Sequence, residues 1–145
     1  MISQHDPARQ QSGMILIEAL LAILVFSLGI LALVGLQAAA VKQSADAKYR
    51  TEAALLANEI IGQMWVSDRT TSVLQANFNS PGGATYVNWL GRVSGVLPGV
   101  VANSPTAPTI AIDAEGIATV TVAWNAPNEP AGTPPHQYVA IAQIR

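Results

Sequence analysis

Three residues near the start of the chain have the types and the spacing for a chemical step: Gly13, Met14 and Glu18. Gly13 stands where a polar opening stretch ends and an unbroken apolar segment begins. Cleavage after Gly13 would leave a new ammonium group on Met14, close in sequence to the Glu18 carboxylate. In an array of such segments, the ammonium of one chain could neutralise the carboxylate of a neighbour. A buried charge is tolerated only with a partner, so this pairing gives Glu18 a function in apolar surroundings.

The segment that carries these residues is long enough to cross a membrane. Between residues 14 and 41 the only ionisable side chain is Glu18, and residues 19–41 are uncharged. At about 1.5 Å per residue the uncharged part spans roughly 35 Å as a helix, against about 30 Å for the hydrocarbon core of a bilayer. In lipid the backbone must satisfy its own polar groups, so the segment is predicted to be helical despite Gly29 and Gly35.

Two simpler interpretations of this segment stay open. One is a cleavable secretory signal, with Ala38-Ala39-Ala40 as its small-residue cleavage site. The apolar region of such a signal is usually about 7–15 residues, which is shorter than this one. The other is a plain membrane anchor in which Glu18 is incidental. A carboxylate at the membrane centre costs about 2.5–3.5 kcal/mol, and less near an interface, where Glu18 would lie.

The residues around Gly13 resemble a known family. The sequence Gly-Met-Ile-Leu-Ile-Glu-Ala at 13–19, followed by the apolar run, is similar to the class III signal of type IV pilins and pseudopilins. Residues 27–37 and 47–53, with 56–61 and Met64-Trp65 after them, resemble the minor pilins of the PilV type. The similarity is close over residues 13–66 and loose beyond them. It predicts a class III prepilin-like N-terminus.

The resemblance implies how such a chain is processed and where it is located. A prepilin peptidase would cut after Gly13 and methylate the new amine of Met14, and Glu18 would take part in subunit assembly. The chain would be stored in the inner membrane as a single-pass transmembrane helix with its head in the periplasm. The inner-membrane assembly platform would then extract it into the extracellular pilus, among other major and minor pilins.

Flanking charge alone favours the opposite orientation in the membrane. Arg9 precedes the apolar segment, whereas Lys42, Lys48 and Arg50 follow it, and positive residues are normally enriched on the cytoplasmic side. The location of the head in the periplasm is therefore an implication of the resemblance.

The function that the resemblance implies is structural. The chain is predicted to be a minor type IV pilin that takes part in pilus assembly and initiation, and so in twitching motility and cell adhesion, and not an enzyme. One alternative is a minor pseudopilin of a type II secretion system, which has the same kind of N-terminus. Another is a membrane-anchored binding module, such as an adhesin or a DNA-uptake pilin.

The elements that must position these residues follow from hydrophobic periodicity. No proline occurs between Ala8 and Ser80, and helix formers dominate as far as Trp65, so residues 14–65 are predicted to be one helix. Its second half has an apolar stripe at spacings of three and four, formed by Val41, Ala45, Tyr49, Ala53, Leu56, Ile60 and Met64. The domain prediction is therefore a leader peptide at 1–13, a membrane or filament-core half of the helix at 14–41, and a globular head at 42–145 that includes the amphipathic half.

The head is predicted to be an α+β domain. Residues 67–84 are rich in Thr, Ser, Asn and Gly and are predicted to be a loop. Residues 86–96 have helical spacing and end at Leu97-Pro98-Gly99. Strands are predicted around 110–113, 119–124 and 138–144, the last apolar on both faces, with a proline-rich loop at 127–135. The fold class is pilin-like α+β, a long N-terminal α-helical spine packed on a small antiparallel β-sheet.

Composition argues against most catalytic and nucleic-acid functions. The chain of 145 residues has no cysteine, two histidines and a net charge of −2, so no cysteine zinc site is possible and no basic footprint for nucleic acid is expected. No phosphate loop or nucleophile elbow is present. We therefore expect no cofactor, no metal and no nucleic acid partner.

The remaining polar and aromatic side chains of the head have structural interpretations. Asp113 and Glu115 are predicted to flank a solvated hairpin turn, and His136 to be a solvated loop residue. The three tryptophans lie on apolar faces and are predicted to be in the core: Trp65, Trp89 and Trp124.

Overall fold

The structure is a computed structural model that describes residues 8–127, 129–130 and 132–144. It divides into two compact units, the first ending at Ser44 and the second beginning at Ala45. The sequence prediction places the corresponding division between Val41 and Lys42. The predicted leader peptide at 1–13 lies partly outside the described residues, because residues 1–7 are not among them.

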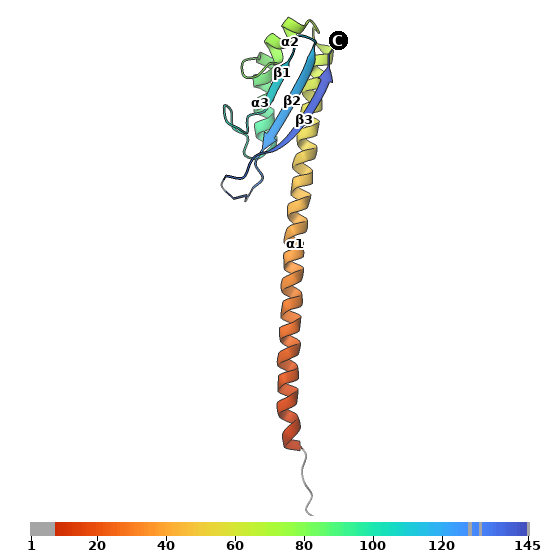
Figure 1. Ribbon diagram of the computed structural model, residues 1–145, viewed down its shortest axis with the longest axis vertical. Coiled ribbons are helices and arrows are strands. Elements are labelled where there is room, and N and C mark those ends of the chain that lie inside the picture. Colours follow the sequence, from red (N-terminus) through yellow and green to blue (C-terminus); the bar gives the residue numbers. More distant parts are fainter. Residues whose placement is uncertain (1–7, 128, 131, 145) are drawn as a thin grey trace, which may run out of the picture. The chain divides into compact units, whose positions relative to one another are not determined.

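Helix α1 (Ala8–Val66) runs through both units (Figure 1). The helix predicted for residues 14–65 is confirmed. In the first unit every described side chain from Gly13 to Ser44 is exposed, including the large apolar ones. An apolar helix with no polar face and no covered face needs lipid or neighbouring helices around it.

In the second unit, α1 has one buried face. The buried residues are Ala53, Leu56, Ala57, Ile60 and Met64, which recur at spacings of three, one and four and therefore share one side of the helix. The predicted amphipathic stripe is confirmed here from Tyr49, which packs against the core. The prediction for Trp65 is wrong, since this side chain is 46% exposed. Trp65 follows Met64 by one residue, and a helix turns about 100° per residue, so the indole points away from the core.

Helix α2 (Thr71–Phe78) lies in the stretch that the sequence predicts as a loop, so that prediction is wrong. The helix buries Leu74 and Phe78, which are four residues apart and face the same side. Thr71, Ser72, Val73 and Asn77 have weak helical propensity, and packing of Leu74 and Phe78 into the core cluster outweighs it. Before the helix, the Asp68 carboxylate accepts a hydrogen bond of 2.9 Å from the Thr70 amide, which holds the pKa of Asp68 below its usual value.

Helix α3 (Ala84–Val96) confirms the second helix predicted in the head. It buries Tyr86, Trp89 and Val93, and the backbone amide of Leu97 closes its last turn with a bond to the Val93 carbonyl. The helix begins directly after Gly83. A Cβ added there would come within 2.6 Å of the Asn77 carbonyl carbon and 2.8 Å of the next backbone nitrogen, so only glycine fits the close approach of α2 and α3.

The sheet has three antiparallel strands in the order β1-β2-β3. These are β1 (Thr109–Ile112), β2 (Ile117–Trp124) and β3 (His136–Gln143). The turn between β1 and β2 is held by the Asp113 carboxylate, which accepts hydrogen bonds from the amides of Glu115 and Ile117 at 3.0 and 2.7 Å. Gly116 has a φ of 76° and lies against the Ile144 carbonyl oxygen. The predicted hairpin turn is confirmed.

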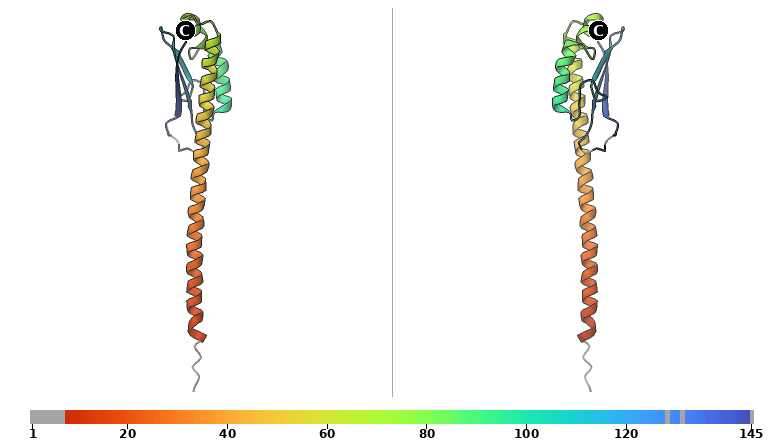
Figure 2. Two further views of the ribbon diagram at one scale, coloured as in Figure 1. Left: turned by 90° about the vertical axis from the view of Figure 1, so that its right-hand side faces the viewer. Right: turned by 90° about the vertical axis from the view of Figure 1, so that its left-hand side faces the viewer.

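The core of the head lies between the inner face of the sheet and the helices. Figure 2 shows the sheet on one side and the helical segments of the head on the other. Val120, Val122 and Trp124 of β2 share one buried cluster with Leu56, Ile60 and Met64 of α1. The fold is thus α+β with a pilin-like layout, as predicted, in which the helical spine supplies the apolar face that three strands lack.

Candidate functional site

Gly13, Met14 and Glu18 all lie within the first unit of α1, and their side chains or Cα atoms are exposed. Met14 is 75% exposed. Because Met14 and Glu18 are four residues apart in a helix, they lie one turn apart on the same face. The structure therefore places the residue that would carry the new ammonium one helical turn before the residue that carries the carboxylate.

Gly13 has no packing function among the residues that the structure describes. A Cβ added at Gly13 meets no atom within 4 Å, and the same is true of Gly29 and Gly35 further along the segment. The φ angle of Gly13 also lies outside the left-handed region, since it is a residue within the α1 helix. A requirement for glycine at this position must therefore come from something other than the fold of this chain.

The apolar part of α1 has the length and composition to cross a membrane. It belongs to a helical stretch that runs from Gly13 to Val66, and its most apolar window has a mean hydropathy of 2.8 with none of it buried in the protein. The one ionisable side chain between residues 14 and 41 is Glu18. The chemical feature of this unit is thus a single carboxylate near the start of a helix that is apolar enough to cross a membrane.

Two contacts fix α3 to the second-unit part of α1. The Trp89 indole Nε1–H donates a hydrogen bond of 3.0 Å to the carbonyl oxygen of Leu56. Arg92 forms an ion pair with Glu59. Arg92 therefore directs its positive charge toward a carboxylate of α1. The ion pair is about half exposed, so its contribution to stability is small.

His136 is not the solvated loop residue that the sequence predicts. It is the first residue of β3, and its ring stacks on Trp124 with centroids 5.6 Å apart and planes at 19°. Its Nε2 lies 2.8 Å from the carboxylate of Glu129, a side chain that is only 10% exposed. The prediction fails because stacking and pairing depend on residues that approach only in the folded sheet. Trp124 is buried as predicted, and its Nε1–H has no partner among the described residues.

The head has two notable surface pockets. One, of about 220 Å³, is lined by Asp46 and Arg50 of α1 together with Trp124, His136 and neighbouring residues. It lies entirely within the second unit and contains both signs of charge beside an aromatic stack.

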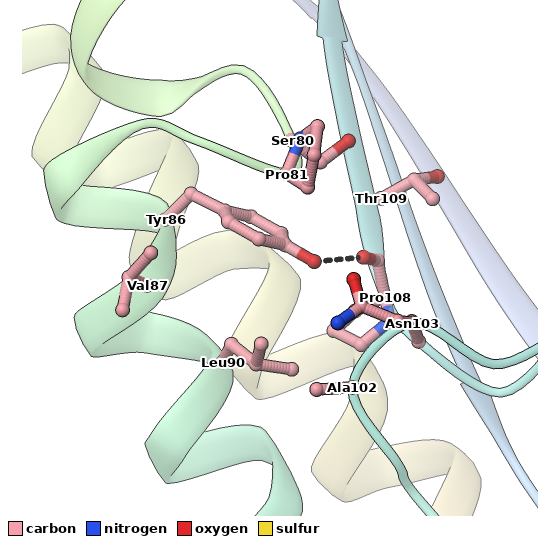
Figure 3. Close-up of a pocket in the computed structure, with 10 residues that line it drawn as sticks. Ser80, Pro81, Tyr86, Val87, Leu90, Ala102, Asn103, Pro108 and Thr109 are labelled. Carbon is pink, nitrogen blue, oxygen red and sulfur yellow. Dashed lines mark hydrogen bonds between the residues drawn. The ribbon is translucent and has the colours of Figure 1, made fainter.

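The other pocket, of about 390 Å³, lies between α3 and the loop that leads into β1 (Figure 3). Its wall is formed by Tyr86, Leu90 and Pro108 among others. The Tyr86 hydroxyl donates a hydrogen bond of 2.8 Å to the Pro108 carbonyl. Burial raises the pKa of this hydroxyl above its usual value of about 10. The hydroxyls of Tyr86 and Ser80 in this wall thus already bind the backbone at the start of β1.

The described residues contain no group of three His, Asp or Glu side chains that could hold a metal ion. The sequence did not reveal the structural roles of Asn79, Ser80 and Tyr86, whose side chains form hydrogen bonds with the backbone around β1. No sequence pattern marked these residues, because their partners are about 22 to 33 positions away in the chain.

Comparisons of the chain with models of protein families, with curated proteins and with solved structures find no match. The functional interpretation consequently rests on the N-terminal helix and on the layout of the head.

Proposed function

We propose that the chain is a minor type IV pilin of the PilV type, a structural subunit that takes part in the assembly and initiation of the pilus. In this proposal a prepilin peptidase cuts between Gly13 and Met14 and methylates the new amine. The chain waits in the inner membrane with its head in the periplasm. The assembly platform then moves it into a filament with other major and minor pilins, through which it contributes to twitching motility and adhesion.

The observation that carries the proposal is the position of Glu18. It is the sole carboxylate of α1 between residues 13 and 44, where the described side chains are all exposed, and it lies one turn after Met14. Within a bilayer or a bundle of such helices, an unpaired carboxylate is costly. A neighbour's Met14 ammonium would remove that cost, and the positive end of a helix that begins at Met14 would favour the carboxylate as well.

The exposed glycine at the junction supports the proposal independently. Nothing in the described part of the fold requires glycine at residue 13, whereas a peptidase that must bind an extended backbone at its cleavage site can require a residue without a side chain. The α+β head built on the same helix also agrees with the pilin-like layout.

Mass spectrometry of the mature N-terminus tests this function. We expect a chain that begins at N-methylated Met14 when the protein is made together with a prepilin peptidase, and an uncut Gly13→Leu variant. Gly29→Leu is the matched control, because a Cβ meets nothing within 4 Å at either position; this variant should be cut normally. A mature chain that begins at Val41 would instead establish a secretory signal, and a chain that retains Met1 would establish a plain anchor.

A minor pseudopilin of a type II secretion system is the nearest alternative, because the same helix and the same processing would serve it. The two functions separate in a deletion strain. Loss of pili that is restored by the wild-type chain supports the pilus, whereas retained pili with loss of protein secretion supports the pseudopilin.

A further inference from the structure

The two edge strands of the sheet, β1 and β3, differ in whether their outward backbone groups have hydrogen-bond partners. At the β1 edge, Ser80 donates its amide to the Ile110 carbonyl at 3.0 Å and accepts the Ile110 amide at its hydroxyl at 3.2 Å. The Ile112 amide donates to the Asn79 side-chain oxygen at 2.9 Å, and Gln75 donates to the Ile112 carbonyl at 2.8 Å. The backbone groups on this edge are therefore occupied by residues of the chain itself.

At the β3 edge, backbone groups are left without partners. The Ile144 amide donates to the Gly116 carbonyl at 2.8 Å. This bond shows which residue pairs between β2 and β3 are the hydrogen-bonded ones. Because hydrogen-bonded and non-hydrogen-bonded pairs alternate in an antiparallel ladder, the even-numbered residues of β3 bond to β2. The amides and carbonyls of Gln137, Val139 and Ile141 then point away from the sheet, and no donor or acceptor in the described ranges meets them.

The side chains along this edge are apolar and exposed. Val139 is 48% and Ile141 is 69% exposed, and their register partners on β2 are Thr121 and Thr119. The register of β3 with β2 is unbroken from end to end. Lysine, proline and bulges are the usual protection of an edge strand, and none of them occurs within β3 as the structure describes it.

We propose that the free edge of β3 binds an extended, uncharged segment of a different protein chain, which joins the sheet as a fourth strand. The unpartnered amides and carbonyls select an extended backbone, as in strand addition to other exposed sheet edges. The side chains beside them select an uncharged, β-branched partner, because a charged one would lose water next to Val139 and Ile141 without gaining a counter-ion. This inference goes beyond pilus assembly, and only the choice of a different chain over a second copy rests on the membrane anchoring of the proposed function.

A second copy of the chain is a poor occupant, because of the direction of β3. His136, at the start of β3, lines a pocket with Asp46 and Arg50. At the other end, Gly116 beside Ile144 approaches Thr71, which follows α1. The strand therefore runs in the same sense as the adjoining part of α1 (Figure 1).

Antiparallel pairing of two β3 strands would consequently turn the two α1 segments in opposite senses. The points at which each chain continues toward its apolar segment would then lie at opposite ends of the pair. If both apolar segments lie in one membrane, as the proposed function has it, this antiparallel pairing is disfavoured, and we assign the edge to a segment of another protein.

Hydrogen exchange of individual amides, measured by NMR on the full chain in detergent micelles, tests the proposal. The probe is a short peptide of alternating threonine and valine with blocked ends. Without the peptide, the amides of Val139 and Ile141 should exchange fast, and those of Ala140 and Ala142 slowly. With the peptide, exchange at Val139 and Ile141 should slow by about tenfold or more, which corresponds to about 1.4 kcal/mol.

Two variants should abolish that protection while leaving the sheet intact. Val139→Pro removes one outward amide, and proline is tolerated on an edge strand where its nitrogen faces solvent. Ile141→Lys adds a charge on the outer face and keeps the backbone unchanged. Ala111→Lys is the matched control on the exposed face of β1 and should bind the peptide as the wild type does. Slow exchange at Ala140 in each variant would show that β2 and β3 still pair.

Three results would overturn the proposal. One is unchanged exchange at Val139 and Ile141 at the highest soluble peptide concentration. Another is protection that rises with protein concentration without peptide, which would make a second copy the occupant. The third is equal protection by a peptide in which lysine replaces valine, since that would remove the requirement for an uncharged partner.

Discussion

Replacement of Trp89 by alanine tests how the head is held to its helical spine. The Trp89 side chain is fully buried, its indole donates a hydrogen bond to the Leu56 carbonyl, and its ring lies 6.3 Å from that of Tyr86. Removal of a buried tryptophan side chain costs about 3–5 kcal/mol, and loss of the hydrogen bond adds about 1 kcal/mol. We therefore expect Trp89→Ala to lower the free energy of unfolding by about 4–6 kcal/mol.

Trp65→Ala is the matched control, because it deletes the same kind of side chain from another helix of the head, α1, where the indole is not buried. Trp65 is 46% exposed, so its replacement should cost less than about 1 kcal/mol. Urea unfolding of the full chain in mild detergent, followed by near-ultraviolet circular dichroism, gives both values.

A whole domain is stable by only about 5–15 kcal/mol, and Trp89→Ala can therefore unfold the head outright. Trp89→Phe retains most of the ring and loses the hydrogen bond, so it should give a measurable intermediate cost. Equal unfolding midpoints for Trp89→Ala and Trp65→Ala would refute the reasoning, since burial would then have no influence on the cost.

Three further predictions follow from other parts of the molecule. Under the proposed function, Glu18→Leu should leave the amount of protein in the membrane and the cleavage of the leader unchanged but should nearly abolish incorporation into sheared pili. Glu18→Asp should have a milder effect. Incorporation of Glu18→Leu at the wild-type level would show that Glu18 has no role in assembly. Gly83→Ala should destabilise the head by about 1–3 kcal/mol, because its Cβ meets the Asn77 backbone, and a thermal melt will measure this. The raised pKa of Tyr86 means that stability is present below pH 10 and is lost as pH rises further. In Tyr86→Phe the free energy of unfolding should depend less on pH above pH 10, and the variant also loses the hydrogen bond to Pro108.

Much of the fold follows from local patterns in the sequence. Apolar residues without a break predict the first part of α1, and the stripe at spacings of three and four predicts the buried face that Ala53 to Met64 present. Alternation with period two predicts β2, because a half-buried strand turns successive side chains to opposite faces. Proline and glycine mark the end of α3 and the hairpin turn before β2.

The failures have one cause, which is packing between residues distant in the chain. Helix α2 has a loop-like composition, yet burial of Leu74 and Phe78 makes it a helix. Trp65 belongs by periodicity to the edge of an apolar stripe, and only the position of the sheet shows that it lies outside the core. His136 stands in a proline-rich sequence, but Trp124 on the neighbouring strand provides the ring on which it stacks.

The candidate sites divide in the same way. The sequence by itself predicts the N-terminal site, because the proposed cleavage after Gly13 and the proposed pairing of Glu18 depend on residue types and spacing along one helix, and a helix places neighbours in sequence as neighbours in space. Only the tertiary structure decided which edge of the sheet stays open. Strand order and the bonds from Gln75, Asn79 and Ser80 to β1 are set by contacts across the chain, and no local pattern encodes them.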